Sequence, residues 1–466
     1  MSDLYGILTS AAGSLKAFQS ALDVTQNNVS NSQTPGYVTQ TAVLDSLSFN
    51  TATGLQGGVE AGTPQSSRNQ YAEAAVRQQV TLAGNSAQLA TSLQPIEQIF
   101  NVTGTGGIAN ALDALFQSFS SWANNPSHTG AQSAVLNAAS QTATAIQQSA
   151  HQLGQITTSV NGDIQSTLTA INQAAATIQQ YNEKQQGPAK PDAGLDAQLN
   201  AALETLAQYG DVQSMTQPDG SVTVLLGGQV PLVIGNQVNQ LRLTYTTPSG
   251  ATNPSATPNA TIVDSNGTDV TGKLSDGQLG ALLSVRNTVL PQLIGGPNDD
   301  GGLNTLASSL ADTVNGLLAN AGGAPLFTYD SSTATAAAST IALNSSLQPQ
   351  DLVAADAGPP AVSNGTALAL SNLANDPTQG PQGMTFGQFY ASMATSLGNQ
   401  TSEAQTASTA DSQSVTQARA LRQQLSGVSL DEQAMQLMQL QRSYQASSQM
   451  VSVIDQILQS VINMVQ

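Results

Sequence analysis

Few residues in this chain have the types and the spacing that catalysis requires. The segment 267–273 comes nearest to a nucleotide-binding pattern, because it opens on a glycine and ends in Gly272 and Lys273, as phosphate-binding loops do. Those loops need Ser or Thr after the lysine to bind magnesium, and Leu274 stands there instead. We therefore expect a hairpin loop that ends at Lys273, and no nucleotide site.

Other candidates for acid–base or metal chemistry also lack partners. His128 and His151 have no carboxylate three or four residues away, so each is expected to be a solvated surface histidine. Asp299 and Asp300 lie in a glycine-rich run without the alternating ligands and the final glutamate of a calcium loop, which predicts a plain turn. We expect no enzyme activity, no catalytic residues, no metal and no cofactor.

The composition is typical of a large chain with a buried core and few charges. Its 466 residues allow more than one domain, and 39% of them are hydrophobic whereas 9% are charged. The net charge of -18 disfavours nucleic acid and anionic membranes as partners, and no basic patch is visible. The absence of cysteine excludes disulfides, thiolate metal sites and cysteine nucleophiles.

Neither end of the chain has the pattern of a membrane-targeting segment. Residues 1–20 lack a basic region followed by a continuous apolar run, so we expect no Sec signal peptide. The apolar run at 443–466 is broken by Ser, Gln and Asn at about every second position, which predicts an amphipathic helix and no membrane insertion. A protein of this kind stays in the cytosol or leaves the cell by another route.

Apolar residues spaced alternately by four and three predict a long amphipathic helix with coiled-coil character near the N-terminus. They are Leu4, Leu8, Ala11, Leu15, Phe18, Leu22 and Val29, with Thr25 as the one polar member. The helix should end near Ser30, because the Pro35–Gly36 pair favours a tight turn and the residue before a proline is extended. Tyr37 follows as an amphipathic anchor.

The C-terminal end repeats this design over residues 430–465, after a capping-box pattern at Ser429 and Glu432. Its heptad positions are Leu437, Leu440, Tyr444, Val451, Ile454, Leu458, Val461 and Val465, interrupted only by Ser447. A second apolar stripe consists of Ala446, Met450, Val453, Ile457 and Met464. This face is wide enough for two neighbours, which we interpret as the N-terminal helix and a second copy of the chain.

We therefore expect the two terminal helices to form an assembly interface. Its predicted members are Leu4, Leu8, Leu15, Phe18, Leu22, Val29, Leu437, Leu440, Tyr444, Met450, Val451, Ile454, Leu458, Val461 and Val465. The alternative is a coiled coil within a monomer, which would expose a large apolar surface to water.

Between the ends, helical periodicity covers 68–100, 108–181 with a break at Asn124–Pro126, and 196–209. Trp122 follows two phenylalanines at helical spacing and is expected in the core. Strand-like runs at 221–226, 230–234, 241–246 and 260–263 predict a small antiparallel unit. Helices are predicted again at 278–293, at 303–321 and from Thr385 onward.

The predicted fold is mainly α with a small inserted β domain, in an elongated multi-domain chain whose long terminal helices pair as a coiled coil. The terminal coiled-coil domain joins 1–48 with 427–466. A helical body domain joins 49–210 with 275–426, and the antiparallel β domain covers 211–274.

The turn after the first helix carries a recognisable motif, formed by Asn27, Asn28, Asn31, Thr34, Pro35, Gly36 and Tyr37. The run 27–37 resembles the signature of bacterial flagellar rod, hook and hook-associated axial proteins, with Ser30 and Gln33 where the family usually has Ala and Asn. The runs 430–432 and 441–446 resemble the family's C-terminal motif, and 106–126 resembles its hook-associated members at the hook–filament junction.

This resemblance implies a structural adaptor that is exported unfolded through the flagellum's own secretion apparatus. It would polymerise in a ring between hook and filament in the extracellular flagellum, and it would be needed for filament assembly and motility. The implied partners are further copies of the chain, the hook protein, the second hook–filament junction protein and an export chaperone.

Two alternatives remain at the level of sequence. A flagellar hook or distal-rod protein should have more β structure directly after Tyr37. A secreted coiled-coil effector or adhesin would be found free in the medium when filaments are removed.

Overall fold

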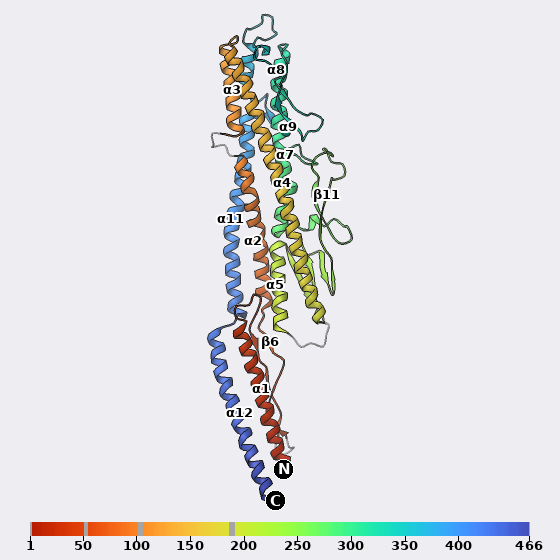
Figure 1. The fold of residues 1–466 in the computed structure, drawn as a ribbon, viewed down its shortest axis with the longest axis vertical. Helices are drawn as coiled ribbons and strands as arrows, with labels where there is room; N and C mark the ends of the chain where they lie inside the picture. Colours follow the sequence, from red (N-terminus) through yellow and green to blue (C-terminus); the bar gives the residue numbers. More distant parts are fainter. Residues whose placement is uncertain (1, 51–54, 101–105, 186–191, 466) are drawn as a thin grey trace.

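The computed structural model describes residues 2–50, 55–100, 106–185 and 192–465, and the side chains within them except those of 2–5, 55, 56 and 465. The molecule is elongated, with a helical body at one end and a terminal coiled coil at the other (Figure 1). Both chain ends lie together at the tip of the coiled coil. The mainly helical, elongated fold predicted from the sequence is confirmed.

The terminal coiled coil consists of α1 (Ser2–Ser30) and α12 (Leu430–Val465), which pack along each other in opposite directions. The predicted end of the first helix at Ser30 and the predicted start of the last at Leu430 are confirmed. The backbone N–H of Glu432 donates to the Ser429 hydroxyl over 3.4 Å, which is one half of the predicted capping box.

The helical body is built on three long helices, α2 (Gln70–Ile99), α4 (Thr129–Gln185) and α11 (Phe386–Ser426), and on two of 17 residues, α3 (Ile108–Asn124) and α5 (Ala193–Tyr209). At 57 residues, α4 is roughly 85 Å long and forms a spine against which the other elements pack. Its buried face, which includes Leu153, Val160, Ile164 and Ile171, follows the helical period read from the sequence.

Shorter elements pack along the body and complete its far end. The helices are α6 (Gly277–Ser284), α7 (Leu290–Ile294), α8 (Gly302–Asn320), α9 (Ala337–Thr340) and α10 (Gly365–Asn372). A π-helical turn, η3 (Val285–Val289), joins α6 to α7, so the predicted helix at 278–293 is continuous but not uniform. The described residues also form the 3₁₀ turns η2 (Thr271–Lys273), η4 (Pro349–Asp351) and η5 (Pro381–Gly383), and β13 (Phe327–Thr328) pairs with β14 (Ala342–Leu343).

The inserted β region is antiparallel, as predicted, and consists of two sheets. The first has the order β10-β9-β8-β7 and is formed by β7 (Val212–Thr216), β8 (Val222–Leu226), β9 (Val230–Ile234) and β10 (Gln237–Val238). The second pairs β11 (Arg242–Thr246) with β12 (Asn259–Val263). Buried side chains of both sheets belong to the same core as α4, so this region is continuous with the body.

Three asparagine side chains on the helices each form two hydrogen bonds with the backbone of one residue in the β region. Each accepts from that residue's N–H and donates to its carbonyl. Asn182 of α4 accepts from the Val222 N–H over 2.7 Å and donates to the Val222 carbonyl over 2.9 Å. Asn172 makes the same pair of bonds with Leu241, and Asn287 makes it with Ala260. The amide group therefore acts as a short strand edge that attaches the sheets to the helices without any charge.

We expect Asn182→Asp to lower the free energy of unfolding by on the order of 3 kcal/mol. Asn182 is fully buried, and a carboxylate would leave the carbonyls of Val222 and Gly235 without their donor. Urea unfolding measures the effect. Asn375→Asp, at an exposed position, is the control and should change stability by less than ~0.5 kcal/mol. Equal stability of the two variants would contradict this role of Asn182.

A long antiparallel hairpin runs beside α1, and the sequence did not predict it. Its strands are β1 (Gln40–Thr41), β2 (Leu44–Ser46), β3 (Phe49–Asn50), β4 (Leu55–Gln56), β5 (Val59–Ala61) and β6 (Gln65–Ser66), which pair β1 with β6, β2 with β5 and β3 with β4. The Ser10 hydroxyl of α1 donates to the Gly57 carbonyl over 2.8 Å.

This hairpin changes the predicted domain boundary at residue 48. That boundary would separate the two paired arms near their tip, so a boundary after Ser66 fits the structure better. The hairpin's strands are only two or three residues long and lead directly into α2, so the helical body, and no β domain, follows the turn among the residues that the structure describes.

Candidate assembly interface

The inner seam of the coiled coil, defined as the predicted heptad positions of α12, faces α1. Leu440 and Ile454 are buried, and Leu437, Tyr444, Val451, Leu458 and Val461 are half-buried. On α1, Leu8, Leu15, Phe18 and Leu22 are half-buried, and Ala11 and Thr25 are buried. Leu4 and Val465 lie in these helices, but their side chains are outside the described residues.

Val29 departs from the predicted seam, because its side chain is 39% exposed while the neighbouring Asn28 is buried. The buried position is Asn28, whose side chain is held by hydrogen bonds to Gln40 and to Gln433 of α12. Heptad reading also missed Ala17 and Ala21, which are both 1% exposed.

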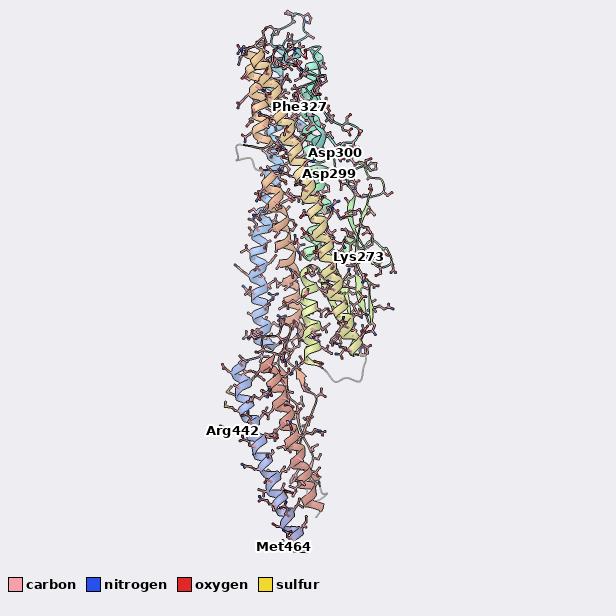
Figure 2. The ribbon with its side chains drawn as sticks, viewed as in Figure 1. Lys273, Asp299, Asp300, Phe327, Arg442 and Met464 are labelled. Carbon is pink, nitrogen blue, oxygen red and sulfur yellow. The ribbon has the colours of Figure 1, made fainter. Side chains whose placement is uncertain are left out.

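The outer stripe of α12 faces solvent. It contains the predicted second-stripe residues Ala446, Met450, Val453, Ile457 and Met464, all exposed, with Met450 at 58%. Met464 lies at the tip of the coiled coil (Figure 2). Apolar side chains repeated along one exposed helix face mark a surface for protein contact.

The turn motif forms one hydrogen-bonded cluster. The Asn31 amide donates to the Asn27 side chain over 2.9 Å, and the Thr34 hydroxyl donates to Asn31 over 3.0 Å. The Tyr37 hydroxyl bonds the Asn27 and Asn28 side chains over 3.0 and 2.9 Å, and burial raises the pKa of Tyr37. Tyr37 therefore folds the turn back onto the end of α1, as its predicted anchoring role requires.

Asn28 connects three segments of the terminal coiled coil. Its side chain accepts from the Gln40 N–H over 2.9 Å and donates to the Gln40 carbonyl over 2.8 Å. It also donates to the side chain of Gln433, on α12, over 2.9 Å. Both side chains are buried, so this one residue joins α1, the hairpin and α12.

We call the contact between the coiled coil and the body the joint. The break between α11 and α12 lies in it: the Ser426 carbonyl accepts from the Thr39 N–H over 3.0 Å, and the Thr39 hydroxyl donates to the Gly427 carbonyl over 2.8 Å. Gly36 has a φ of 75°, and a Cβ there would lie 2.4 Å from the Ala197 carbonyl oxygen of α5. The turn therefore packs backbone to backbone against the body.

Five ion pairs at the joint connect α2, α5 and α11. Arg68 pairs with Glu73 and with Asp196, and it also donates to the Gly36 carbonyl over 2.7 Å. Arg422 bridges Glu73 and Glu204, and Arg419 pairs with Glu204 as well. The chain has few charges, and these five ion pairs lie together where the turn packs against the body. They therefore fix the position of the turn on the body.

Burial and charge act in opposite directions on Glu204. Burial alone would raise the pKa of Glu204, but the hydrogen bonds and charges of Arg422 and Arg419 outweigh it and hold the pKa below its usual value. Arg77, beside this cluster, has its pKa lowered by burial, and Glu73 partly offsets that effect. The ionised form of Glu204 is therefore the one that the folded joint favours.

Acid is expected to weaken the joint through Glu204. Because its folded-state pKa is lowered, its stabilisation is present above the ordinary value of 4.5 and is lost as the pH falls through the lowered pKa. The unfolding temperature, followed by circular dichroism, should fall in this range, and Glu204→Gln should remove part of the fall. Glu403→Gln, at an exposed carboxylate, is the control. Identical pH profiles for both variants would refute the contribution of Glu204.

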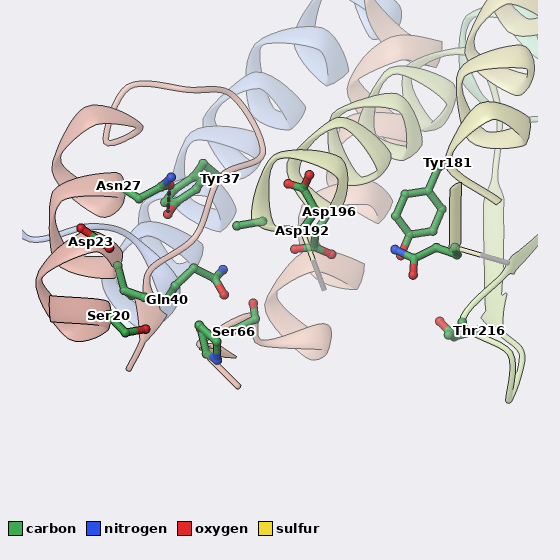
Figure 3. Close-up of a pocket in the computed structure, with 15 residues that line it drawn as sticks. Ser20, Asp23, Asn27, Tyr37, Gln40, Ser66, Tyr181, Asp192, Asp196 and Thr216 are labelled. Carbon is green, nitrogen blue, oxygen red and sulfur yellow. Dashed lines mark hydrogen bonds between the residues drawn. The ribbon is translucent and has the colours of Figure 1, made fainter. Parts of the chain in front are cut away.

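A cleft of about 510 Å³ opens at the joint, between α1, the hairpin and the ends of α4 and α5 (Figure 3). Its lining includes Asp23, Tyr37, Tyr181, Asp192 and Asp196. Asp192 caps α5 and Asp196 pairs with Arg68, so these carboxylates serve the structure. Within the described residues, no group of His, Cys, Asp or Glu could hold a metal ion.

The candidates for chemistry lie apart from one another. Lys273 is exposed at the end of the 3₁₀ turn η2 on the flank of the body, and Leu274 is buried (Figure 2). His128 and His151 are exposed.

Asp299 and Asp300 form a turn, in which Asp299 accepts from the Gly301 N–H over 2.9 Å. Trp122 is fully buried in the core, as predicted. In the described part of the chain, no helix is long and apolar enough to span a membrane.

Family models cover most of the chain. One described as the flagellar hook-associated protein FlgK helical domain matches residues 93–324. The two ends match models of flagellar basal body rod proteins, at 8–37 and at 421–464. The terminal models cover the turn motif and most of α12, so the sequence motifs and the family models coincide.

The similar proteins found by sequence comparison share the description flagellar hook-associated protein 1. Flagellar hook-associated protein 1 of Bacillus subtilis (strain 168) is 23% identical over 98% of this chain and 97% of its own length. The protein of that name from Escherichia coli (strain K12) is 24% identical over 98% of this chain and 99% of its own length.

A solved structure, the flagellar hook junction protein FlgK from Burkholderia pseudomallei, shares the fold with a TM-score of 0.61 at 18% identity, over 76% of this chain and 100% of that one. Terminal motifs, helical body and fold agree, and the chain belongs to the flagellar hook-associated protein 1 family of structural flagellar proteins.

Proposed function

We propose that this chain is the structural adaptor of the hook–filament junction, where its copies polymerise in a ring between the hook and the flagellin filament. One observation carries the proposal: α12 uses its inner seam for α1 and leaves its outer stripe exposed. A chain that functioned alone would have no use for such a stripe, whereas a subunit of a ring buries it against a neighbour.

The proposed partners are further copies of the chain, the hook protein on one side and the second hook–filament junction protein on the other. An export chaperone would bind the chain before export through the flagellum's own secretion apparatus, without a Sec signal. The proposed location is the extracellular flagellum. The network at the joint supports this role, because it orients the coiled coil relative to the body and an adaptor must hold both at once.

We also propose that the chain has no catalytic activity. The family is one of structural proteins, and Lys273, His128 and Asp299 lie in separate exposed or turn positions. The exposed outer stripe would be buried in the assembled ring, which leaves the contact between copies as the functional site.

Electron microscopy of isolated flagella, labelled with antibody against this chain, tests the proposal. We expect label only at the boundary between hook and filament. Label along the hook or the rod would favour an axial protein of another position. Protein found only in the medium, with none on the flagella, would favour a secreted effector or adhesin.

A further inference from the structure

Two exposed patches lie on opposite sides of α1 in the terminal coiled coil. The hairpin patch consists of Asp45, Leu47, Phe49 and Glu60. The stripe patch consists of Arg442, Ala446, Met450 and Val453 on the outer stripe of α12. α12 lies along one side of α1 and the hairpin along the other (Figure 1). One copy of the chain therefore cannot bring its own two patches together.

The hairpin patch combines like charges with an exposed aromatic ring. Asp45 lies directly opposite Glu60 in the β2–β5 ladder, and like charges in that position destabilise a strand pair. Both carboxylates are exposed, and neither takes part in an ion pair within the described chain. Leu47 and Phe49 follow Asp45 at alternating positions, and the Phe49 side chain is 72% exposed. This patch fits a partner that supplies one cation and an apolar surface.

The stripe patch has that composition. Arg442 is exposed and lies on the α12 side of the coiled coil (Figure 2). It makes no ion pair with any described residue. Ala446 and Met450 follow it at intervals of four residues and Val453 after three more, so all four share one helix face.

The spacing of the two patches agrees. Eight residues of helix separate Arg442 from Met450, which is ~12 Å. Four residues of strand separate Asp45 from Phe49, which is ~13 Å. In both patches the charged end is nearer the joint, because α12 and the first hairpin arm both run away from it. In a neighbouring copy that is shifted sideways, Arg442 therefore lies beside the carboxylates of the hairpin patch. Met450 then lies beside Phe49.

The two patches also lie at similar heights along the molecule. Asn28 of α1 contacts Gln433 of α12, and Ser10 lies 28 - 10 = 18 residues earlier on α1. Since the helices run in opposite directions, Ser10 is level with about residue 433 + 18 = 451 of α12. The hairpin is bonded to α1 where Ser10 donates to Gly57, and a Cβ added at Gly57 would lie 3.1 Å from the Phe49 side chain. Phe49 and Met450 are thus at nearly the same level.

We propose that the stripe patch of one copy packs on the hairpin patch of the next, with Arg442 between Asp45 and Glu60 and with Met450 and Val453 against Phe49. This inference rests on the proposed ring and names its contact surfaces. Each copy offers one patch on each side, so the contact is heterologous and repeats around a ring or a helix. It also places a cation beside the like-charged strand pair that a single copy leaves uncompensated, which reduces the repulsion between the two carboxylates.

Engineered cysteines test the contact, because the chain has no cysteine of its own. In a strain whose only copy carries Phe49→Cys and Met450→Cys, oxidation of isolated flagella should give a ladder of cross-linked multimers. Each single variant should give none. Tyr71→Cys with Met450→Cys is the matched control, because Tyr71 is 89% exposed but lies at the start of α2, in the body.

Charge reversal gives a second, independent test. Arg442→Glu should reduce the number of filaments per cell at least several-fold, and adding Asp45→Lys with Glu60→Lys should restore them. Junctions labelled by antibody but without a Phe49–Met450 ladder would overturn this contact and leave the proposed ring intact. No label at the junction in the wild type would overturn the ring itself. The double-cysteine variant could fail to assemble, and the charge reversal then decides. The contact is overturned if Asp45→Lys with Glu60→Lys does not restore filaments to the Arg442→Glu strain.

Discussion

Replacing Leu458 by aspartate is expected to leave cells with bare hooks, no filaments and no motility. Leu458 is half-buried on the inner seam, where α12 faces α1. A carboxylate at this position must lose water or push the two helices apart, and either costs on the order of several kcal/mol. Every copy in a ring carries the same defect, so each subunit presents a displaced α12, and with it a displaced outer stripe, to its neighbour.

Export of the variant should be unaffected, because the secretion apparatus is proposed to pass an unfolded chain. We therefore expect the Leu458→Asp protein and flagellin in the medium, detected by immunoblot, with bare hooks in the electron microscope. Gln459→Asp adds the same charge at the next, exposed position and should give normal filaments. Normal filaments on Leu458→Asp cells would show that the inner seam does not build the junction.

The ends of the molecule could be predicted because their signals are local and repeated. The heptads of the last helix recur over 36 residues, and Ser429 marks its start, so the prediction of 430–465 was correct at both ends. At the first helix, the Pro35–Gly36 turn and the end of the heptads gave the same stop at Ser30. Long periodic helices need little information from the rest of the chain.

The hairpin 40–66 could not be predicted for the opposite reason. Its strands have two or three residues each, which is too short for any periodicity. They are held by partners elsewhere in the chain, such as Ser10 for Gly57 and Asn28 for Gln40. The antiparallel character of 211–274 was predicted, but its division into two sheets was not, because Asn172 and Asn182 attach its strands to α4 at separate points.

Only part of the joint could be predicted from the sequence. The motif from Asn27 to Tyr37 was identified, and its side chains do bond one another. The ion pairs that hold the joint together were not predicted. Arg68 pairs with Asp196, 128 residues away in the sequence, and Arg422 pairs with Glu204, 218 residues away. Ion pairs between residues so far apart produce no recognisable spacing in the sequence. They can be identified only from the structure, where the helices lie side by side.

Gly36→Ala is expected to loosen the joint and to abolish filament attachment. The residue has a left-handed φ of 75°, which costs an L-amino acid about 1–2 kcal/mol. The added methyl would also lie 2.4 Å from the Ala197 carbonyl oxygen, so the turn and α5 must separate. Since the Gly36 carbonyl accepts from Arg68, which pairs with Asp196, that separation weakens the ion network as well. We expect a loss of on the order of 3 kcal/mol in urea unfolding.

Two further glycines separate these causes. Gly250 has a φ of 79° with nothing within 4 Å of an added Cβ, so Gly250→Ala should cost only about 1–2 kcal/mol. Gly154, inside α4, has equally open surroundings without a left-handed φ, and Gly154→Ala should stabilise the helix slightly. Both control variants should assemble filaments. If Gly36→Ala is no less stable than Gly250→Ala and its cells bear filaments, the close approach of the turn to α5 does not position the coiled coil on the body.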